Sequence, residues 1–163
     1  MKKAPNGVYF CDTECMTEYA FANKEKGKQI KHKEQKRQLK DSDRSLRLKE
    51  AQRSFNTFIR ARDKGHSCIS CGRSTGAKMN AGHYKSVGAN PELRFEELNC
   101  HLQCEHCNSF KSGNIENYRP ALIKKIGLCK VEWLEGPHKS KKYTCDQLKG
   151  IELKYKAKIK GLV

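Results

Sequence analysis

Four cysteines of the chain fall into two pairs with the same spacing. Cys68 and Cys71 form the pair in "CISC", and Cys104 and Cys107 form the pair in "CEHC". Two such pairs can supply four thiolates to one tetrahedral Zn²⁺ ion, and the βαβ context of a thioredoxin-like redox pair is absent here. Because four thiolates leave no open coordination position, we expect a structural zinc site that couples metal binding to folding.

Histidine and asparagine side chains gather between the two pairs and directly after them. His83 lies in "NAGHYKS", Asn99 lies in "RFEELNCHLQ", and Asn108 directly follows Cys107. A neutral imidazole can take a proton from water near neutral pH, and an amide oxygen can bind a divalent cation. Taken alone, His83 could be a packed strand residue and Asn108 a helix N-cap. Taken together, these residues leave two interpretations open, a zinc knuckle in a polar loop or the frame of an active site.

The chain carries a formal net charge of +16, from 34 Lys and Arg residues against 18 Asp and Glu residues. A charge of this size predicts a polyanionic partner, of which nucleic acid is the commonest, although a merely basic or ribosome-associated protein is the alternative. No long apolar run or basic amphipathic helix points to a membrane. The residues expected to contact DNA phosphates, with an affinity that falls steeply with salt, are Lys31, Lys33, Lys36, Arg37, Lys78, Lys85, Lys111 and Arg119.

The cysteine content also indicates a redox compartment. The chain has nine cysteines, an odd number, and its first residues, "MKKAPNGVYF", lack the apolar core of a signal peptide. We therefore expect a reducing cytoplasm, in which CxxC pairs bind metal instead of forming disulfides. Cys100, Cys129 and Cys145 belong to no motif and are expected to be free thiols.

Composition and spacing predict the elements that must position these residues. Residues 24–64 have helix-forming composition, and one helical face is shared by Ala51, Phe55, Phe58 and Ile59. We expect a helix over 43–63 that packs by this face, preceded over 24–42 by a basic helix or a frayed arm. Residues 65–115 are rich in Gly, Cys, His and Asn, which predicts metal-stapled loops and short strands.

Two further helices are expected toward the C-terminus. The stretch "NYRPALIKKIG" at 117–127 has Pro120 near its first turn and Gly127 as its stop. Thr144 and Gln147 in "TCDQ" have the form of a capping box, so another helix begins there. The apolar stripe of that helix could close the core or form a dimer surface, and it consists of Leu148, Ile151, Tyr155 and Ile159.

Residues 50–127 resemble the phage lambda NinG (Rap) family, on the strength of "AQRSFNTFIRARD", both cysteine pairs, "NAGHYKS" and "CNSFKSGN". The region is also similar to the HNH, or ββα-metal, nucleases and to phage endonuclease VII. The resemblance implies a recombination endonuclease that acts with Mg²⁺ or Mn²⁺ on branched DNA, such as Holliday junctions and D-loops, as a homodimer in the bacterial host. It also implies that His83 is the general base, that Asn99 orients His83 through contacts across the hairpin, and that Asn108 binds the divalent ion.

One position of the nuclease pattern differs in this sequence. Many HNH enzymes have an Asp or His metal ligand directly before the base, and this chain has Gly82 there. Asn80, His101 or His83 itself could complete the ligands of the catalytic ion.

The N-terminal part also departs from the family pattern, which begins with a zinc finger of two cysteine pairs. Cys11 and Cys15 in "CDTEC" form one pair, and an upstream pair is lacking. We expect a shortened reading frame, in which this half-site could bind zinc with His32 or through a second subunit.

The sequence thus predicts an α+β protein with a small zinc-stapled ββα-metal core flanked by long basic α-helices. The expected parts are a zinc-finger remnant at 1–23, a basic helical arm at 24–64, the nuclease core at 65–127 and a C-terminal helical segment at 128–163. The leading function is a metal-dependent, structure-selective DNA endonuclease. The alternatives are a non-catalytic zinc-dependent module that binds branched DNA and a sequence-directed HNH endonuclease.

Overall fold

The chain divides where its apolar residues begin to recur with helical spacing. The computed structural model describes residues 2–3, 9–74, 76 and 78–162. They belong to two units, Met1–Asp43 and Arg44–Val163, each of which is described by itself. The boundary falls inside the segment 24–64 that was grouped as a basic helical arm, next to the expected start of the packed helix at residue 43. The second half of that segment carries the apolar stripe and packs into the larger unit.

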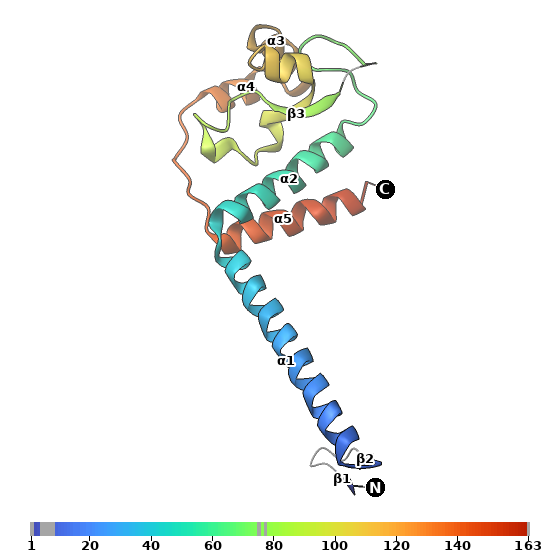
Figure 1. Cartoon of the computed structure of the whole chain (residues 1–163). Coiled ribbons are helices and arrows are strands. Elements are labelled where there is room, and N and C mark those ends of the chain that lie inside the picture. The colour runs from blue at the N-terminus through green and yellow to red at the C-terminus, as the bar shows by residue number, and fades with distance from the viewer. Residues whose placement is uncertain (1, 4–8, 75, 77, 163) are drawn as a thin grey trace. The chain divides into compact units, whose positions relative to one another are not determined.

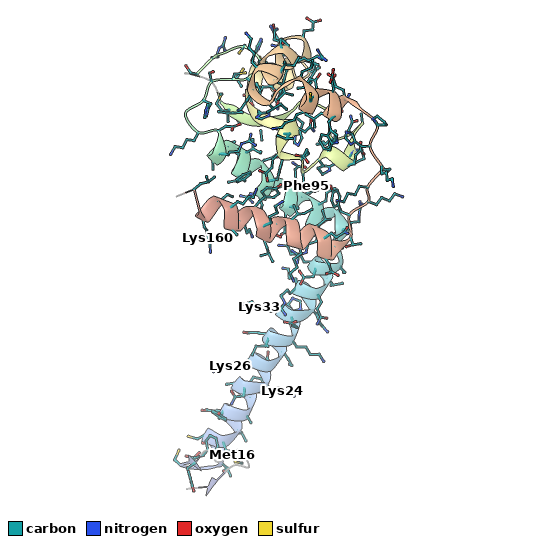
Figure 2. The ribbon with its side chains drawn as sticks, turned by 180° about the vertical axis from the view of Figure 1, so that it is seen from behind. Met16, Lys24, Lys26, Lys33, Phe95 and Lys160 are labelled. Atoms are coloured by element: carbon teal, nitrogen blue, oxygen red, sulfur yellow. The ribbon has the colours of Figure 1, made fainter. Side chains whose placement is uncertain are left out.

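The first unit contains a short hairpin and a long polar helix. Strand β1 (Lys2–Lys3) pairs antiparallel with β2 (Tyr9–Phe10), and α1 (Thr13–Ser42) follows (Figure 1). All of α1 is described and none of its residues is buried; Figure 2 labels Lys24, Lys26 and Lys33 along it. The segment 24–42 is therefore helical, and it offers charge to solvent instead of a packing face.

The second unit is built on a hairpin packed between helices. Its described elements are α2 (Arg44–Arg62), β3 (Met79–His83), the 3₁₀ turns η1 (Pro91–Leu93) and η2 (Glu97–Asn99), β4 (Cys100–Cys104), the π-helical turn η3 (His106–Phe110), α3 (Ile115–Ile126), α4 (Leu128–Glu135) and α5 (Cys145–Lys160). The combination of helices with a small sheet confirms the predicted α+β class. No helix among the described residues combines the length and the apolar character needed to cross a membrane.

Helices α2 and α5 lie side by side and form one part of the core (Figure 1). The predicted stripe on α2 is buried, and Phe55 and Phe58 stack against Tyr155 of α5 with ring centroids 4.9 and 5.2 Å apart. Leu148 of α5 is also fully buried. The C-terminal stripe therefore closes the core, so it is not available as a dimer surface. The predicted capping box at Thr144 and Gln147 is present.

The two faces of the β3–β4 hairpin have different neighbours. The strands are antiparallel, with His83 opposite Cys100 and Gly82 opposite His101. Side chains alternate between faces along a strand, so His83 and Cys100 share the face that packs against α2. Gly82 and His101 lie on the other face, where Tyr118 of α3 donates its hydroxyl to the Gly82 carbonyl at 3.0 Å.

Helices α3 and α4 complete the core on that second face. Tyr118, Leu122, Val131 and Leu134 are fully buried there, together with Tyr84. The helix expected at 117–127 is confirmed as α3, which ends at Gly127, whose φ of +89° is a conformation that glycine adopts readily. Pro120 lies inside α3 instead of near its first turn, and α4 is a separate helix within the predicted C-terminal helical segment.

We predict that Leu148→Ala lowers the free energy of unfolding by about 2–5 kcal/mol, because it removes a fully buried side chain from the α2–α5 contact. Leu153→Ala is a matched control in the same helix, since Leu153 is 59% exposed. Its effect should stay within about 0.5 kcal/mol. Denaturant unfolding of the zinc-loaded proteins measures both values. Equal destabilisation by the two substitutions would contradict the packing described here.

Candidate metal centre and active site

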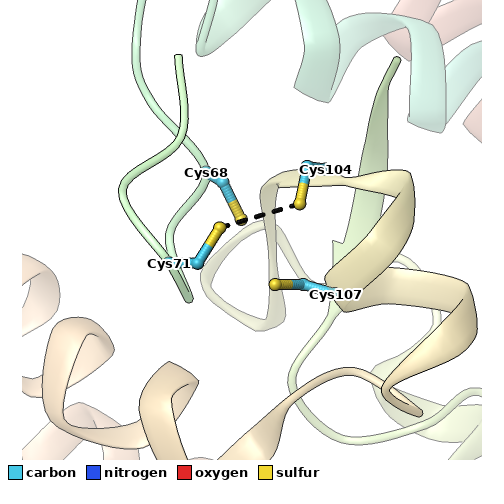
Figure 3. Close-up of side chains that lie close together, drawn as sticks. All are labelled: Cys68, Cys71, Cys104 and Cys107. Atoms are coloured by element: carbon cyan, nitrogen blue, oxygen red, sulfur yellow. Dashed lines mark hydrogen bonds between the residues drawn. The ribbon is translucent and has the colours of Figure 1, made fainter. Parts of the chain in front are cut away.

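Two loops bring four cysteine sulfurs together where β4 ends. The Sγ atoms of Cys68, Cys71, Cys104 and Cys107 all lie within 4.8 Å of one another (Figure 3). Those of Cys71 and Cys104 are 3.7 Å apart. Two sulfurs that each bind a tetrahedral zinc at about 2.3 Å are separated by about 3.8 Å. The four sulfurs could therefore hold a zinc ion, in agreement with the sequence spacing.

Local backbone contacts explain the shape of the first loop. The Cys68 carbonyl accepts the N–H of Gly72 at 2.8 Å, and Gly72 has a φ of +72°, which a residue without a Cβ adopts readily. The N–H of Ile69 donates to the Leu102 carbonyl at 3.0 Å. The first loop is thus attached directly to the strand that ends in Cys104.

The electrostatics of the cluster favour a bound cation. Burial raises the pKa of the Cys107 thiol to about 12. Burial also acts to raise the pKa of Cys68, but nearby backbone hydrogen bonds outweigh it and lower that pKa to about 7. Asn114 donates to the Cys107 sulfur at 3.4 Å, a contact that stabilises a thiolate. Because neighbouring thiolates repel one another, all four can ionise together only beside a positive ion.

His83 is the last residue of β3 and is half-buried on the face that packs against α2. Its Nε2 lies 3.0 Å from the Arg94 carbonyl oxygen, and its Nδ1 lies 3.7 Å from the Cys100 sulfur. A carbonyl oxygen can only accept, so Nε2 carries the hydrogen and Nδ1 keeps a lone pair. Burial lowers the pKa of His83 below its ordinary value, so the ring is neutral near pH 7.

Asn99 is fully buried and fixes the chain that leaves β3. Its Oδ1 accepts the Lys85 N–H at 2.8 Å, and its Nδ2 donates to the carbonyls of Lys85 at 3.0 Å and Leu93 at 3.2 Å. Its own carbonyl accepts the N–H of Tyr84 at 2.8 Å. Asn99 thus contacts the backbone that directly follows His83, and no hydrogen bond among the described residues joins it to the His83 ring. Its orienting role stays a prediction.

Asn108 lies in η3, directly after the zinc-ligand candidate Cys107, and is half-buried. No hydrogen bond joins its side chain to any residue that the structure describes, so its amide oxygen is free for another ligand. Within the same described ranges, no hydrogen bond or ring contact connects Asn108 to His83. The structure therefore places Asn108 beside the cysteine cluster, and its role as a ligand of a catalytic ion stays a prediction.

The position before His83 is filled by packing. A Cβ on Gly82 would lie 2.2 Å from Oε1 and 2.8 Å from Cβ of Gln103. Gln103 is fully buried and cannot easily move, since its Nε2 donates to Ser70 Oγ at 2.7 Å and to the Gly113 carbonyl at 2.5 Å. A metal-binding side chain does not fit at Gly82 beside this glutamine.

His101 and Asn80, which could have replaced the missing ligand, lie on the other face of the hairpin from His83. The Nε2 of His101 lies 3.1 Å from the Leu98 carbonyl, and its Nδ1 lies 3.1 Å from Arg62 Nη2, which donates to it. Both ring nitrogens are therefore engaged. The structure does not bring His101 or Asn80 next to His83 as further ligands.

Comparison with known proteins gives a family for this arrangement. All of residues 1–163 match the family model described as Bacteriophage Lambda NinG protein. The chain belongs to the NinG family. It is similar to Protein ninG of Salmonella phage P22, with 47% identity over 107 residues, which are 66% of this chain and 53% of that protein. It is also similar to Protein ninG of Escherichia phage 933W and of Escherichia phage lambda, each with 46% identity over 107 residues, which are 66% of this chain.

The matched residues are 53% of the phage 933W protein and 52% of the phage lambda protein, so the chain spans about half the length of the curated relatives it matches. No solved structure matches the chain.

The cations predicted to contact DNA form two groups in this NinG-family chain. Lys78, Arg119 and Arg37 are each ion-paired with a glutamate at 2.7–2.8 Å. Hydrogen bonds from Arg119 and Tyr84 lower the pKa of Glu135 to about 2, so that pair stays charged near neutral pH. A neighbouring carboxylate therefore offsets part of the charge of each of these three cations. No ion pair among the described residues engages the others, which are Lys31, Lys33, Lys36, Lys85 and Lys111.

The cysteine pair of the first unit forms an incomplete ligand set. Possible ligand atoms of Cys11, Asp12 and Cys15 lie within 4.8 Å of one another. The contact with Cys11 raises the pKa of the Cys15 thiol to about 11. His32 lies much farther along α1, about 25 Å from Cys15 at about 1.5 Å per residue. The suggestion that His32 of the same chain completes this site is therefore wrong.

Sequence reasoning missed two neighbours of His83. A strand register drawn between β3 and β4 would have placed Cys100 opposite His83. The contact with Arg94 involves its backbone carbonyl, and no residue type in the sequence signals such a contact.

We predict that Cys104→Ser loses one equivalent of zinc and unfolds the second unit, because structural zinc contributes on the order of 10 kcal/mol to the folding of small modules. The Cys129→Ser variant should keep its zinc and its fold, since Cys129 is exposed and belongs to neither cysteine cluster. Elemental analysis and circular dichroism, with and without a chelator, measure the two effects. Equal zinc content in both variants would contradict the proposed ligands.

Proposed function

We propose that this NinG-family chain is a metal-dependent endonuclease that cuts branched DNA recombination intermediates, such as Holliday junctions and D-loops. The observation that carries the proposal is the setting of His83. Its Nε2 hydrogen is held by a backbone carbonyl, its ring is neutral, and the strand that bears it pairs with the strand that ends in the cysteine cluster. These are the properties that a general base requires.

In the proposed reaction, Nδ1 of His83 takes a proton from a water molecule as the water oxygen bonds to the phosphorus of the scissile phosphate. The bond from phosphorus to the leaving oxygen breaks, and that oxygen takes a proton from solvent. Cys100 Sγ lies 3.7 Å from Nδ1, and burial raises the pKa of its thiol well above the ordinary value, so Cys100 stays neutral. The thiol can donate only a weak hydrogen bond to Nδ1, and the attacking water must displace it.

Asn99 has a positioning role in this proposal. Its two side-chain hydrogen bonds to the Lys85 backbone prevent the chain after β3 from moving. The His83 ring is thereby kept against the Arg94 carbonyl, which selects the tautomer with its lone pair on Nδ1.

Asn108 is the residue that would hold a catalytic Mg²⁺ or Mn²⁺ ion, because its amide oxygen is a hard ligand without a partner among the described residues. Such an ion would supply positive charge at the scissile phosphate and the leaving oxygen. With one neutral protein ligand, most of its coordination would come from water and from phosphate oxygens. We therefore expect modest metal affinity in the absence of DNA.

Branched DNA as the substrate is supported by the net charge of +16 and by family membership. A four-way junction is resolved by two cuts, so we propose a homodimer with one active site in each subunit. The dimer surface must lie outside the α5 stripe, because that stripe packs against α2.

One observation favours a second candidate, a zinc-dependent module that binds branched DNA without cutting it. The position before His83 has no room for a ligand, because Gln103 fills the space over Gly82. Binding would then depend on charge alone. Cleavage that requires both a divalent metal and His83 separates the two candidates.

We predict that His83→Ala lowers the rate of metal-dependent junction cleavage by at least about 100-fold, the usual contribution of a general base. His66→Ala is the matched control, because His66 is exposed and, among the described residues, its side chain hydrogen-bonds only to the Asp63 backbone carbonyl. Purified zinc-loaded proteins are incubated with a four-way junction or a linear duplex, in Mg²⁺, Mn²⁺ or EDTA. Binding without cleavage in either metal by the wild type would contradict the enzyme proposal. Cutting of the linear duplex at a defined sequence would instead indicate a sequence-directed nuclease.

The pH dependence of cleavage provides a second test. The lowered pKa of His83 means that its neutral, active form is populated at and above pH 6.5 and is lost as the pH falls through a value below the ordinary 6.5. Because kcat/KM reports the free enzyme, its acid limb should have a midpoint below 6.5. A midpoint above 6.5, measured while the protein stays folded, would contradict this assignment of the base.

A further inference from the structure

A shallow hollow of about 390 Å³ lies along one side of α2 in the second unit. Lys49, Arg53 and Arg60 line it from α2, and Arg94 lines it from the connection between β3 and β4. The two uncharged polar residues of this surface are Gln52 and Asn56. We call this surface the α2 groove.

The charge of the α2 groove is of one sign. Its lining contains four cationic side chains and no carboxylate. A neighbouring hollow on α2 differs, since Glu50 and Glu152 line it together with Arg53 and Lys156. The α2 groove is therefore suited to an anion, whereas the lining of the neighbouring hollow has two cations and two carboxylates.

The polar groups of the groove are ordered before any ligand binds. Arg94 donates from Nη1 to Gln52 Oε1 at 3.2 Å and from Nη2 to the Val87 carbonyl at 3.5 Å. Gln52 in turn donates to Asn56 Oδ1 at 2.8 Å. Arg94 is thus held by neutral partners and keeps its full positive charge, unlike Arg119, which is neutralised by a glutamate.

The groove is connected directly to His83. The side chain of Arg94 lines the groove, while its carbonyl oxygen accepts the His83 Nε2 hydrogen. Phe55 belongs to the same helix as the groove, and its ring centroid lies 5.8 Å from that of His83. A ligand in the groove therefore touches the residue that fixes the proposed base.

The length of the groove fits a run of nucleic-acid phosphates. From Lys49 to Arg60, α2 extends about 16 Å at about 1.5 Å per residue. One DNA strand carries a phosphate about every 3.4 Å along the duplex axis, so about five phosphates span the same distance. A small anion would need only one or two of these cations.

We infer that the α2 groove binds the sugar–phosphate backbone of a DNA strand and leads that strand toward His83. This inference rests on the proposed function, because it deepens the account of how that active site receives its substrate. None of the cations predicted from the sequence to contact DNA lines this groove.

The test measures junction binding as a function of salt in a His83→Ala background, in which the DNA stays intact. The groove variant is Lys49→Ala/Arg53→Ala/Arg60→Ala. The matched control removes three exposed lysines from α3, α4 and α5, with Lys124→Ala/Lys130→Ala/Lys149→Ala. A third variant, Lys49→Arg/Arg53→Lys/Arg60→Lys, keeps every charge.

Each lost phosphate contact reduces the slope of log K against log salt by about 0.9 for duplex DNA, so the groove variant should lose about 2.7 from its slope. The control and the charge-preserving variant should keep slopes within about 0.9 of the parent value. Equal slopes for the groove variant and the control would overturn the inference. Any decrease in slope would then reflect the lower net charge of both variants and not contacts in the groove.

Cleavage by the same variants with His83 intact separates this inference from the proposed function. One outcome is that the wild type cuts junctions and the groove variant keeps both the full salt slope of binding and the full cleavage rate. The groove inference then fails and the nuclease proposal stands. If the groove variant loses its slope as expected and even the wild type cuts nothing, the groove is a binding surface and the nuclease proposal fails.

Discussion

The second unit depends on a convergence of four sulfur atoms from two loops that lie far apart in the sequence. An isolated two-stranded hairpin is only marginally stable in water. Each cysteine pair alone supplies only two of the four ligands that a tetrahedral zinc ion needs. With all four sulfurs within 4.8 Å of one another, a single cation can join the loop that carries Cys68 and Cys71 to the end of β4. Every residue of β4 is buried. A bound metal would therefore fix the end of β4, the fully buried strand of the hairpin.

The two faces of the β3–β4 hairpin pack against different parts of the second unit. On the face toward α3, Gln103 fills the space over Gly82, and His101 lies against Asp63 and Arg62. Although burial alone would raise the pKa of Asp63, its contacts with His101 and Arg62 hold that pKa well below its usual range, so Asp63 is ionised beside Arg62. The other face presents His83 at the edge of the α2 packing. His83 thus lies beside a buried interior in which Gln103 Nε2, His101 and Asp63 make hydrogen bonds.

Elements with a local signal were predictable from the sequence. The spacing within each cysteine pair, the apolar face on α2 and the capping box at Thr144 each depend on residues close together in the chain, and each is present. Features that depend on distant partners were not predictable. The ion pair of Arg119 joins two helices, and the contact of His83 with the Arg94 carbonyl joins a strand to a turn. The same limit applies to Gly82, whose neighbour Gln103 is revealed only by the strand register.

We propose that the four cysteine sulfurs bind zinc without any further ligand, so that His83 and Asn108 stay available for the proposed reaction. Zinc K-edge X-ray absorption on the zinc-loaded protein tests this claim most directly. The account predicts four sulfur neighbours at about 2.3 Å and no nitrogen or oxygen in the first coordination shell. A shell that contains nitrogen or oxygen would mean that a histidine or an asparagine such as Asn108 binds the zinc. That result would contradict the separation of the structural metal from the proposed chemistry.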